Sequence, residues 1–369
     1  MKPDVLFLLH LPPAIHGSAV VGLSIKESSR INQAFDSRYI NLLLSSEVND
    51  SGNLSLSKMF KALKISFQLV KTLLRKKPDV CYFALTTTGT AFFKDFLLIV
   101  LLKIFCVRRV YHLHNKGFAQ KEASAFYRRL FDFTFKDSRV IILSRHLYTD
   151  IAPYVPLKQV EVCPNGVARV AGKVEERTNA IPRILFLSNL IKSKGVIILL
   201  EACVLLKNRN CSFQCTIAGG DGDISGVQLN EMIRLLDLTD YVSYVGSKFG
   251  SEKDQVFRCA DIFVFPTYYN AETFGLVNAE AMQYRLPVVS TFEGGIPDIV
   301  EDGVTGFLVP QRDVGALADK MEILLNDAEL RKRMGEAGFS KYENEFTQEK
   351  FEDRLIEILQ HVIDDRLTD

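Results

Sequence analysis

The feature that most constrains the fold of this chain is a repeated alternation of short apolar runs with segments of helical length. In the first half, the runs have the length and composition of buried parallel strands. They occupy residues 4–10, 39–43, 79–84, 109–113, 139–143 and 160–163. Segments of helical length, such as residues 58–75 and 122–135, lie between them. This order predicts a doubly wound α/β domain.

The second half repeats the same rhythm. Strands are expected at residues 183–188, 213–218, 242–245, 262–265, 288–290 and 307–309, and helices at 195–207, 228–236, 274–284, 313–326 and 328–339. A chain of 369 residues is too long for one ordinary core. We therefore expect an α/β protein with two Rossmann-like doubly wound domains facing across a cleft. The first spans residues 1–175 and the second 176–346, with a polar linker at 171–182, and a last helix in 347–369 packs back on the first.

The net charge of +1 hides a division between the halves. Residues 1–175 contain 25 Lys and Arg against 13 Asp and Glu, whereas residues 176–369 contain 20 against 31. A basic half joined to an acidic half indicates that the first half meets an anionic partner. A nucleic acid, a phospholipid surface and a diphosphate-linked lipid all fit, and charge alone does not choose among them.

Cysteine usage and hydropathy predict the compartment. The 7 cysteines are odd in number and lie mostly within apolar runs, which is typical of free thiols in a reducing cytoplasm. Residues 1–10 lack the pattern of a signal peptide, and no window reaches the roughly 18 apolar residues of a membrane span. We therefore expect a cytoplasmic protein.

The stretch from Phe265 to Met282 carries the clearest chemistry. A strand is expected to end near Pro266, and a helix to begin near Phe274 after a loop. A helix N-terminus beyond a strand's carboxyl end suits a diphosphate, and Gly275 lets the backbone approach closely. Glu272 precedes this helix and Glu280 lies about 9 Å along it, so the two carboxylates could bind sugar and ribose hydroxyls. From spacing alone, two ordinary glutamates on the helix surface are an equally good interpretation.

The residues that follow make the pattern specific. Glu272 and Glu280 are followed by Ala281-Met282, Leu286-Pro287-Val288-Val289, Gly294-Gly295-Ile296-Pro297 and the run from Glu301 to Val309. This series resembles the retaining GT-B glycosyltransferases of family 4, also called glycosyltransferase group 1. The resemblance implies a GT-B fold, a nucleotide-sugar donor, retention of the anomeric configuration, and no metal or other cofactor.

Further site residues are implied by the same resemblance. Lys194 matches the family's donor-phosphate lysine, although a solvated loop lysine is the alternative interpretation. The family has an arginine where this chain has Asn189, and Arg145 is a candidate replacement. Gly17 matches a small-residue loop near the donor, and His114 a histidine near the transferred sugar.

The resemblance also implies roles for these residues. Lys194, Arg145 and the backbone amides of Phe274, Gly275 and Leu276 would stabilise the leaving diphosphate. Glu272 and His114 would orient the sugar, and Glu280 the ribose. The Asp221-Gly222-Asp223 sequence could be a metal site, but its place after a glycine pair favours a turn.

The acceptor is expected on the basic first domain. Residues 58–77 form a basic amphipathic pattern, and residues 91–109 add an apolar stretch. Such helices can lie in an anionic membrane interface. For either helix alone, packing on the core with its lysines in water is the better interpretation.

Charge and helices together predict a protein at the cytoplasmic face of the inner membrane, with a glycan or lipid-linked acceptor in bacterial surface polysaccharide or lipopolysaccharide synthesis. A soluble sugar or small-metabolite acceptor is one alternative. A non-catalytic nucleotide-sugar-binding protein is another, which the departure at Asn189 favours. We expect no nucleic-acid partner, because no nucleic-acid module is recognisable.

Overall fold

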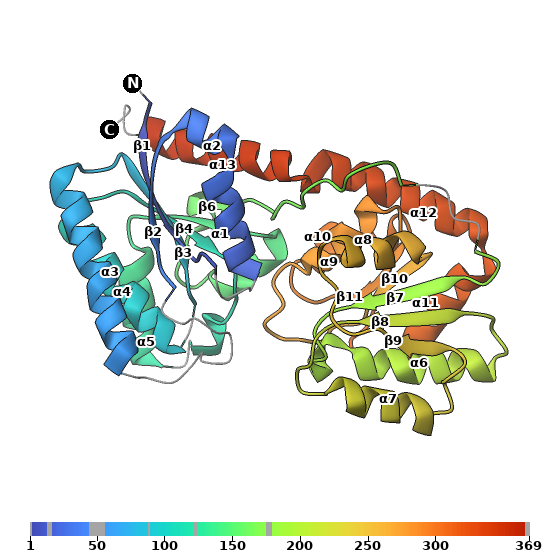
Figure 1. Cartoon of the computed structure of the whole chain (residues 1–369). Helices are drawn as coiled ribbons and strands as arrows, with labels where there is room; N and C mark the ends of the chain where they lie inside the picture. Colours follow the sequence, from blue (N-terminus) through green and yellow to red (C-terminus); the bar gives the residue numbers. More distant parts are fainter. Residues whose placement is uncertain are drawn as a thin grey trace. The chain divides into compact units, whose positions relative to one another are not determined.

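The chain forms two compact units in the computed structural model, which describes residues 2–12, 17–43, 56–87, 89–121, 124–174 and 179–365 (Figure 1). Unit 1 comprises Met1–Gly166 together with Glu349–Asp369, and unit 2 comprises Val167–Gln348. The division falls at residue 166, before the polar segment expected to be the linker. Val167 belongs to unit 2 because its N–H donates to the carbonyl of Phe346 over 2.8 Å.

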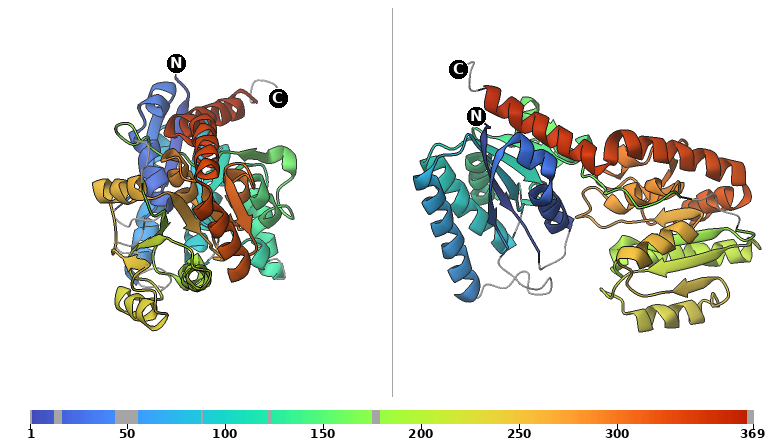
Figure 2. Two further views of the ribbon diagram at one scale, coloured as in Figure 1. Left: turned by 90° about the vertical axis from the view of Figure 1, so that its right-hand side faces the viewer. Right: turned by 45° about the horizontal axis from the view of Figure 1, so that its top comes forward.

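Unit 1 is built on a six-stranded parallel sheet with the order β2-β1-β3-β4-β5-β6. The strands are β1 (Asp4–Leu9), β2 (Asp36–Asn41), β3 (Val80–Leu85), β4 (Arg109–Leu113), β5 (Arg139–Ile142) and β6 (Val160–Val162). One face is covered by α3 (Leu56–Arg75), α4 (Gly89–Ile104) and α5 (Ala125–Phe135), and the other by α1 (Gly17–Glu27), α2 (Ser29–Ala34) and α13 (Gln348–Asp364) (Figures 1 and 2).

Alternation along the strands builds a core on each face of this sheet. Leu6 and Leu8 of β1 point into the core beneath α3, α4 and α5, whereas Val5 and Phe7 point into the opposite core. That second core includes Leu355 of α13, so a helix from the end of the chain packs in the same unit as the first strand.

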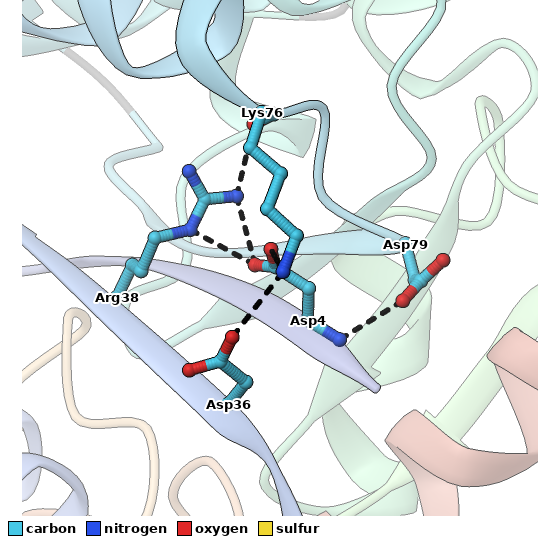
Figure 3. Close-up of polar contacts among 5 residues, drawn as sticks. All are labelled: Asp4, Asp36, Arg38, Lys76 and Asp79. Atoms are coloured by element: carbon cyan, nitrogen blue, oxygen red, sulfur yellow. Dashed lines mark hydrogen bonds and ion pairs between the residues drawn. The ribbon is translucent and has the colours of Figure 1, made fainter. Parts of the chain in front are cut away.

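An ionic cluster ties α3 to the amino ends of the strands (Figure 3). The carboxylate of Asp4 on β1 is 4% exposed and accepts from Arg38 of β2 at 2.8 Å and from Lys76, which follows α3, at 2.8 Å. Lys76 also approaches Asp36 at 3.3 Å, and Asp79 accepts the Asp4 N–H at 2.9 Å. The cluster lies at the edge opposite the strands' carboxyl ends, where ligands of such folds bind, and its role is therefore structural.

Unit 2 repeats the architecture with a sheet of order β12-β11-β10-β7-β8-β9, also fully parallel (Figure 1). The strands are β7 (Arg183–Leu187), β8 (Gln214–Ala218), β9 (Val242–Tyr244), β10 (Ile262–Phe265), β11 (Val288–Thr291) and β12 (Gly306–Val309). The helices are α6 (Val196–Asn208), α7 (Gly226–Leu235), α8 (Gly250–Cys259), α9 (Leu276–Gln283), α10 (Ile296–Ile299), α11 (Val314–Asn326) and α12 (Ala328–Lys341).

The predicted strands are all present, with ends displaced by a few residues. The helices α1, α2, α8 and α10 were not predicted, since they are short or lack a strong apolar period. The helix predicted at residues 274–284 begins later, at Leu276, because Gly275 holds a left-handed conformation (φ +67°) that keeps the residues before it out of the helix. No helix in the described ranges has both the length and the hydropathy needed to cross a bilayer.

Candidate active site

The order of the strands in unit 2 reverses between β7 and β10, because β8 and β9 are added on one side of β7 and β10, β11 and β12 on the other. An open α/β fold binds its ligand at such a switch point. The loops after these two strands are joined by hydrogen bonds. The carbonyl of Ser193 accepts the Tyr268 N–H at 2.7 Å and the Thr267 hydroxyl at 3.3 Å. Gly195 makes this approach possible, because a Cβ there would lie 2.2 Å from the carbonyl oxygen of Pro266.

An ion pair spans the two loops. The Nζ of Lys194, which follows β7, lies 2.5 Å from Oε2 of Glu272, which follows β10. The side chains are only 17% and 12% exposed, and the Lys194 ammonium also lies 4.6 Å from the centroid of the Tyr269 ring. Partial burial strengthens such a pair relative to one in open water. A cation and a carboxylate are thus held together at the sheet edge where open α/β folds bind ligands.

The loop after β11 packs against the loop that carries Glu272 and holds it in place. Gly294 has a φ of +55°, and a Cβ there would lie 2.4 Å from the carbonyl oxygen of Glu272. The N–H of Gly295 donates to the carbonyl of Thr273 over 2.7 Å. The glycine pair of the sequence motif therefore positions the carboxylate through its backbone, since a side chain at Gly294 would push the loops apart and the Gly295 N–H holds Thr273.

Helix α9 begins a few residues after Glu272 in the sequence. Phe274 is buried and packs edge-on against Phe346 at 5.9 Å, which anchors the loop to the unit's interior. Gly275 is the N-cap, and Leu276 is the first helical residue. The first-turn N–H groups of an α-helix have no intrahelical acceptor, so the amides from Leu276 onward can face an anion.

Glu280, farther along α9, has a partner that the sequence did not reveal. Lys253 of α8 lies 2.7 Å from Oε2 and 2.8 Å from Oε1 of this carboxylate. We missed Lys253 because α8 was not predicted, and its lysine resembled any other charged surface residue. The pair holds the carboxylate in place on the helix that also presents the amides of its first turn.

Asn189 and the Asp-x-Asp sequence lie at the same edge. Asn189 is exposed after β7, and its side-chain oxygen faces Gly220, which follows β8. The carboxylate of Asp221 accepts the Gly226 N–H at 2.9 Å, and that of Asp223 accepts the Lys192 N–H at 3.0 Å. Both aspartates thus stabilise turns. No group of three or more His, Cys, Asp or Glu side chains is arranged around a common metal position within the described residues.

A second cation missed by the sequence analysis stands in the loop after β12. The guanidinium of Arg312 lies 4.4 Å from the centroid of the Tyr268 ring. Tyr268 is itself hydrogen-bonded to Ser193, next to Lys194. Arg312 therefore lies at the same edge of unit 2 as Lys194, which makes it a further candidate, beside Arg145, for the charge that Asn189 lacks.

The other predicted residues lie in unit 1, around the carboxyl ends of its strands. His114 follows β4 and the exposed Arg145 follows the neighbouring β5. The ring centroid of His114 lies 4.2 Å from that of His112, which is fully buried and shares a 2.6 Å hydrogen bond with the hydroxyl of Tyr82. Burial, together with His114, lowers the pKa of His112 well below its usual value. His112 is therefore a neutral core residue.

Two buried acids, neither of them singled out from the sequence, organise the loops around these residues. Asp150 accepts the N–H groups of Gly117 at 2.8 Å, Phe118 at 3.2 Å and Ala119 at 3.0 Å, which shapes the loop after His114. Asp95 pairs with buried Lys94 and accepts the Thr86 N–H at 3.0 Å.

The predicted small-residue loop is only partly described. Gly17 is the first residue of α1, and a Cβ there would meet nothing within 4 Å; residues 13–16 lie outside the described ranges. A side chain is instead excluded at Gly22, where a Cβ would lie 2.1 Å from the carbonyl oxygen of His10. Gly22 thus allows α1 to lie close to the residue that follows β1.

A cavity of about 380 Å³ lies at the other edge of this sheet, by the amino ends of β4 and β5. Two of its three arginines bond to the end of α13: Arg108 donates to the carbonyl of Val362 at 2.5 Å, and Arg139 to Asp365 at 2.7 Å. Cations at a helix C-terminus stabilise it. We interpret this cavity as part of the junction with α13, away from the ligand-binding edge.

Comparisons with known proteins bear on the family. The sequence model described as "Glycosyl transferases group 1" matches residues 173–341, which include Asn189, Lys194, Glu272 and Glu280. Unit 2 is therefore similar in sequence to the group 1 glycosyl transferases. A relative with this chemistry in its name, the amylovoran biosynthesis glycosyltransferase AmsK of Erwinia amylovora, is 29% identical over 277 residues. The alignment covers 71% of this chain and 66% of AmsK, so the chain spans less than two thirds of that relative's length.

Solved structures match the fold of nearly the whole chain. A glycosyltransferase from Rickettsia africae superposes with a TM-score of 0.78 at 17% identity, covering 98% of this chain and 99% of that one. HepE from Anabaena, solved in complex with UDP, superposes with a TM-score of 0.75 at 19% identity, covering 97% and 100%. The expected GT-B fold is confirmed.

Proposed function

We propose that this chain is a retaining glycosyltransferase that moves a hexose from a nucleotide-sugar donor to a glycan or lipid-linked acceptor. The observation that carries the proposal is the Lys194–Glu272 ion pair at the β7–β10 switch point. Two relatives support it through what is printed of them: HepE was solved with UDP and with UDP-glucose, and AmsK is named for amylovoran biosynthesis. Our expected setting is bacterial surface polysaccharide or lipopolysaccharide synthesis.

In the proposed reaction, the acceptor hydroxyl attacks the anomeric carbon from the face that the diphosphate leaves. The bond between that carbon and the phosphate oxygen breaks, a bond to the acceptor oxygen forms, and the leaving phosphate takes the acceptor proton. Negative charge therefore accumulates on the diphosphate in the transition state. Cations and N–H donors already held in position stabilise such charge strongly, because they need no reorganisation.

The residues of unit 2 have separate roles in this proposal. Lys194 exchanges its ion pair with Glu272 for a contact with the donor phosphates, and the amides from Leu276 onward face the same diphosphate. Glu272, released from the lysine, accepts hydrogen bonds from sugar hydroxyls. Glu280 accepts hydrogen bonds from the ribose while Lys253 keeps it oriented.

The role of His114 near the sugar and metal independence remain proposals from the resemblance. The role of Arg145 near the phosphates is proposed from its place after a strand, and work at the cytoplasmic face of the inner membrane from the charge and helices of the first half. Activity that survives EDTA would support the absence of a metal. The configuration of the product, read by NMR from the anomeric proton coupling, tests retention.

Thermal unfolding with a panel of nucleotide sugars and free nucleoside diphosphates tests the donor site directly, since a ligand of the native state raises the melting temperature. We expect a shift with one donor class that is lost in Lys194→Ala and Glu280→Ala. Lys207→Ala is the matched control, because it breaks a surface ion pair of the same 2.5 Å length with Asp237. A shift unchanged in Lys194→Ala would refute the assignment.

Transfer to an acceptor separates the enzyme from a binding protein. We expect Glu272→Gln to keep the donor shift but to lose most transfer, since the amide retains the shape and not the charge. A donor shift without transfer to any lipid-linked, glycan or soluble acceptor would identify a non-catalytic nucleotide-sugar-binding protein. Transfer to a soluble sugar without membranes would select the small-acceptor alternative.

A further inference from the structure

The helix α3 exposes apolar side chains in a single line. Phe60, Leu63, Phe67 and Leu74 are 77%, 59%, 71% and 72% exposed. Their spacing of three, four and seven residues places them on one side of the helix. A different side, which includes Leu69 and Leu73, is buried in the core below. The helix is therefore apolar on two sides, of which packing uses only one.

Basic side chains flank this line. Lys64, Lys71 and Arg75 are exposed next to it, and α3 contains no acidic residue. The C-terminal end of α3 is anchored to the sheet, because Lys76, which follows the helix, belongs to the ionic cluster around Asp4 (Figure 3). The exposed line is consequently a feature of a packed helix.

The neighbouring helices continue the apolar surface. Phe93, Leu97 and Ile104 of α4 are exposed on one side of that helix, and Phe126 and Phe133 of α5 are exposed beside them. The Phe93 and Phe126 ring centroids lie 6.5 Å apart. Helices α3 and α4 are in contact, and all three helices cover the same face of the sheet (Figures 1 and 2). We call this outer surface of α3, α4 and α5 the apolar–basic face.

We infer that the apolar–basic face binds the surface of an anionic lipid bilayer, with the α3 line inserted among the acyl chains and its lysines at the phosphates. This inference rests on the proposed function only for the identity of the acceptor. On α3, aromatic and leucine side chains are flanked by lysines and no acidic residue is present, which is the composition of interfacial helices. A protein partner fits less well, because lysine is depleted in protein–protein interfaces. The face would bring the unit that carries His114 to a membrane-embedded acceptor.

Flotation of the purified full chain with lipid vesicles tests the inference. We expect binding to vesicles of phosphatidylcholine with 30% phosphatidylglycerol, weakened by salt and at least tenfold stronger than to phosphatidylcholine alone. The triple variant Phe60→Ser, Phe67→Ser, Leu74→Ser should lose at least tenfold in binding. Its control, Val227→Ser with Leu235→Ser, changes exposed apolar residues of α7 and should bind as the unaltered chain does.

A second pair of variants separates charge from hydrophobicity. Lys64→Glu with Lys71→Glu should lose at least tenfold in binding to anionic vesicles. Lys332→Glu with Arg333→Glu makes the same change in net charge on exposed residues of α12 and should leave binding unchanged. Equal losses in the two variants would show that only net charge matters and would overturn the assignment to α3.

Two other outcomes would refute the inference. One is no flotation with anionic vesicles. The other is a dimer, seen by light scattering, that the Phe60, Phe67 and Leu74 substitutions dissociate, because the face would then serve a second copy of the chain. The donor-induced rise in melting temperature is measured on the same preparations. Since the substituted side chains of α3 lie outside unit 2, a protein that binds donor and not vesicles would refute this inference and leave the proposed function standing.

Discussion

Replacing Gly195 by alanine probes how the sequence next to Lys194 builds the site. Gly195 has a φ of +94°, where an alanine costs about 1–2 kcal/mol. Its new Cβ would also lie 2.2 Å from the carbonyl oxygen of Pro266. Contacts of Cβ atoms below 3.0 Å essentially never occur, so the loops must separate, at a further cost of about 1–3 kcal/mol. We expect Gly195→Ala to lower the free energy of unfolding of unit 2 by about 2–5 kcal/mol.

Gly246→Ala is the matched control, because Gly246 has a φ of +73° and a Cβ there would meet nothing within 4 Å. It should cost only the backbone strain of about 1–2 kcal/mol. Urea unfolding of both variants measures the difference, and the donor-induced thermal shift should shrink only in Gly195→Ala, since that change displaces the loop that carries Lys194. Equal destabilisation by the two substitutions would refute the close-approach argument.

Three further outcomes are expected. Lys94→Met should destabilise unit 1 by about 3–5 kcal/mol in urea unfolding, because it leaves the fully buried carboxylate of Asp95 uncompensated, and adding Asp95→Asn should recover part of the loss. The free energy of unfolding should fall as pH drops below about 6.5, by about 1.4 kcal/mol per pH unit for His112 alone, because its lowered pKa lets only the unfolded chain take up the proton. In His112→Gln the number of protons taken up on unfolding should fall by one, and an unchanged slope of stability against pH would contradict this. Asn189→Arg should tighten donor binding about tenfold in the thermal-shift assay through a charge-assisted contact, whereas Asn189→Gln should not.

Most of the fold could be predicted from the sequence because its signals are local. Buried parallel strands are short apolar runs whatever they pair with, so runs such as residues 109–113 and 262–265 were found with their ends in place. The helices α1 and α8 were missed, because glycines, β-branched residues and charges obscure an apolar period there. Their formation depends on the sheets that they cover.

For the candidate site, too, the sequence identified individual residues and the structure showed their partners. The sequence motif identified Lys194, Glu272 and Glu280, but it could not show that Lys194 pairs with Glu272 or that Lys253 supports Glu280. These partners are separated by 78 and 27 positions along the chain. Strand order brings them together, and strand order is set by how whole βα units pack.

The sequence by itself determined the two series of βα units, the donor motif in residues 265–310 and the basic character of the first half, since each depends on residue type and short spacing. Only the tertiary structure decided which side of α3 is buried. The apolar residues on both sides of that helix look alike in the sequence. The sheet beneath takes up Leu69 and Leu73 and leaves Phe60, Phe67 and Leu74 in contact with solvent, because a helix packed on a sheet can bury only the side that faces it.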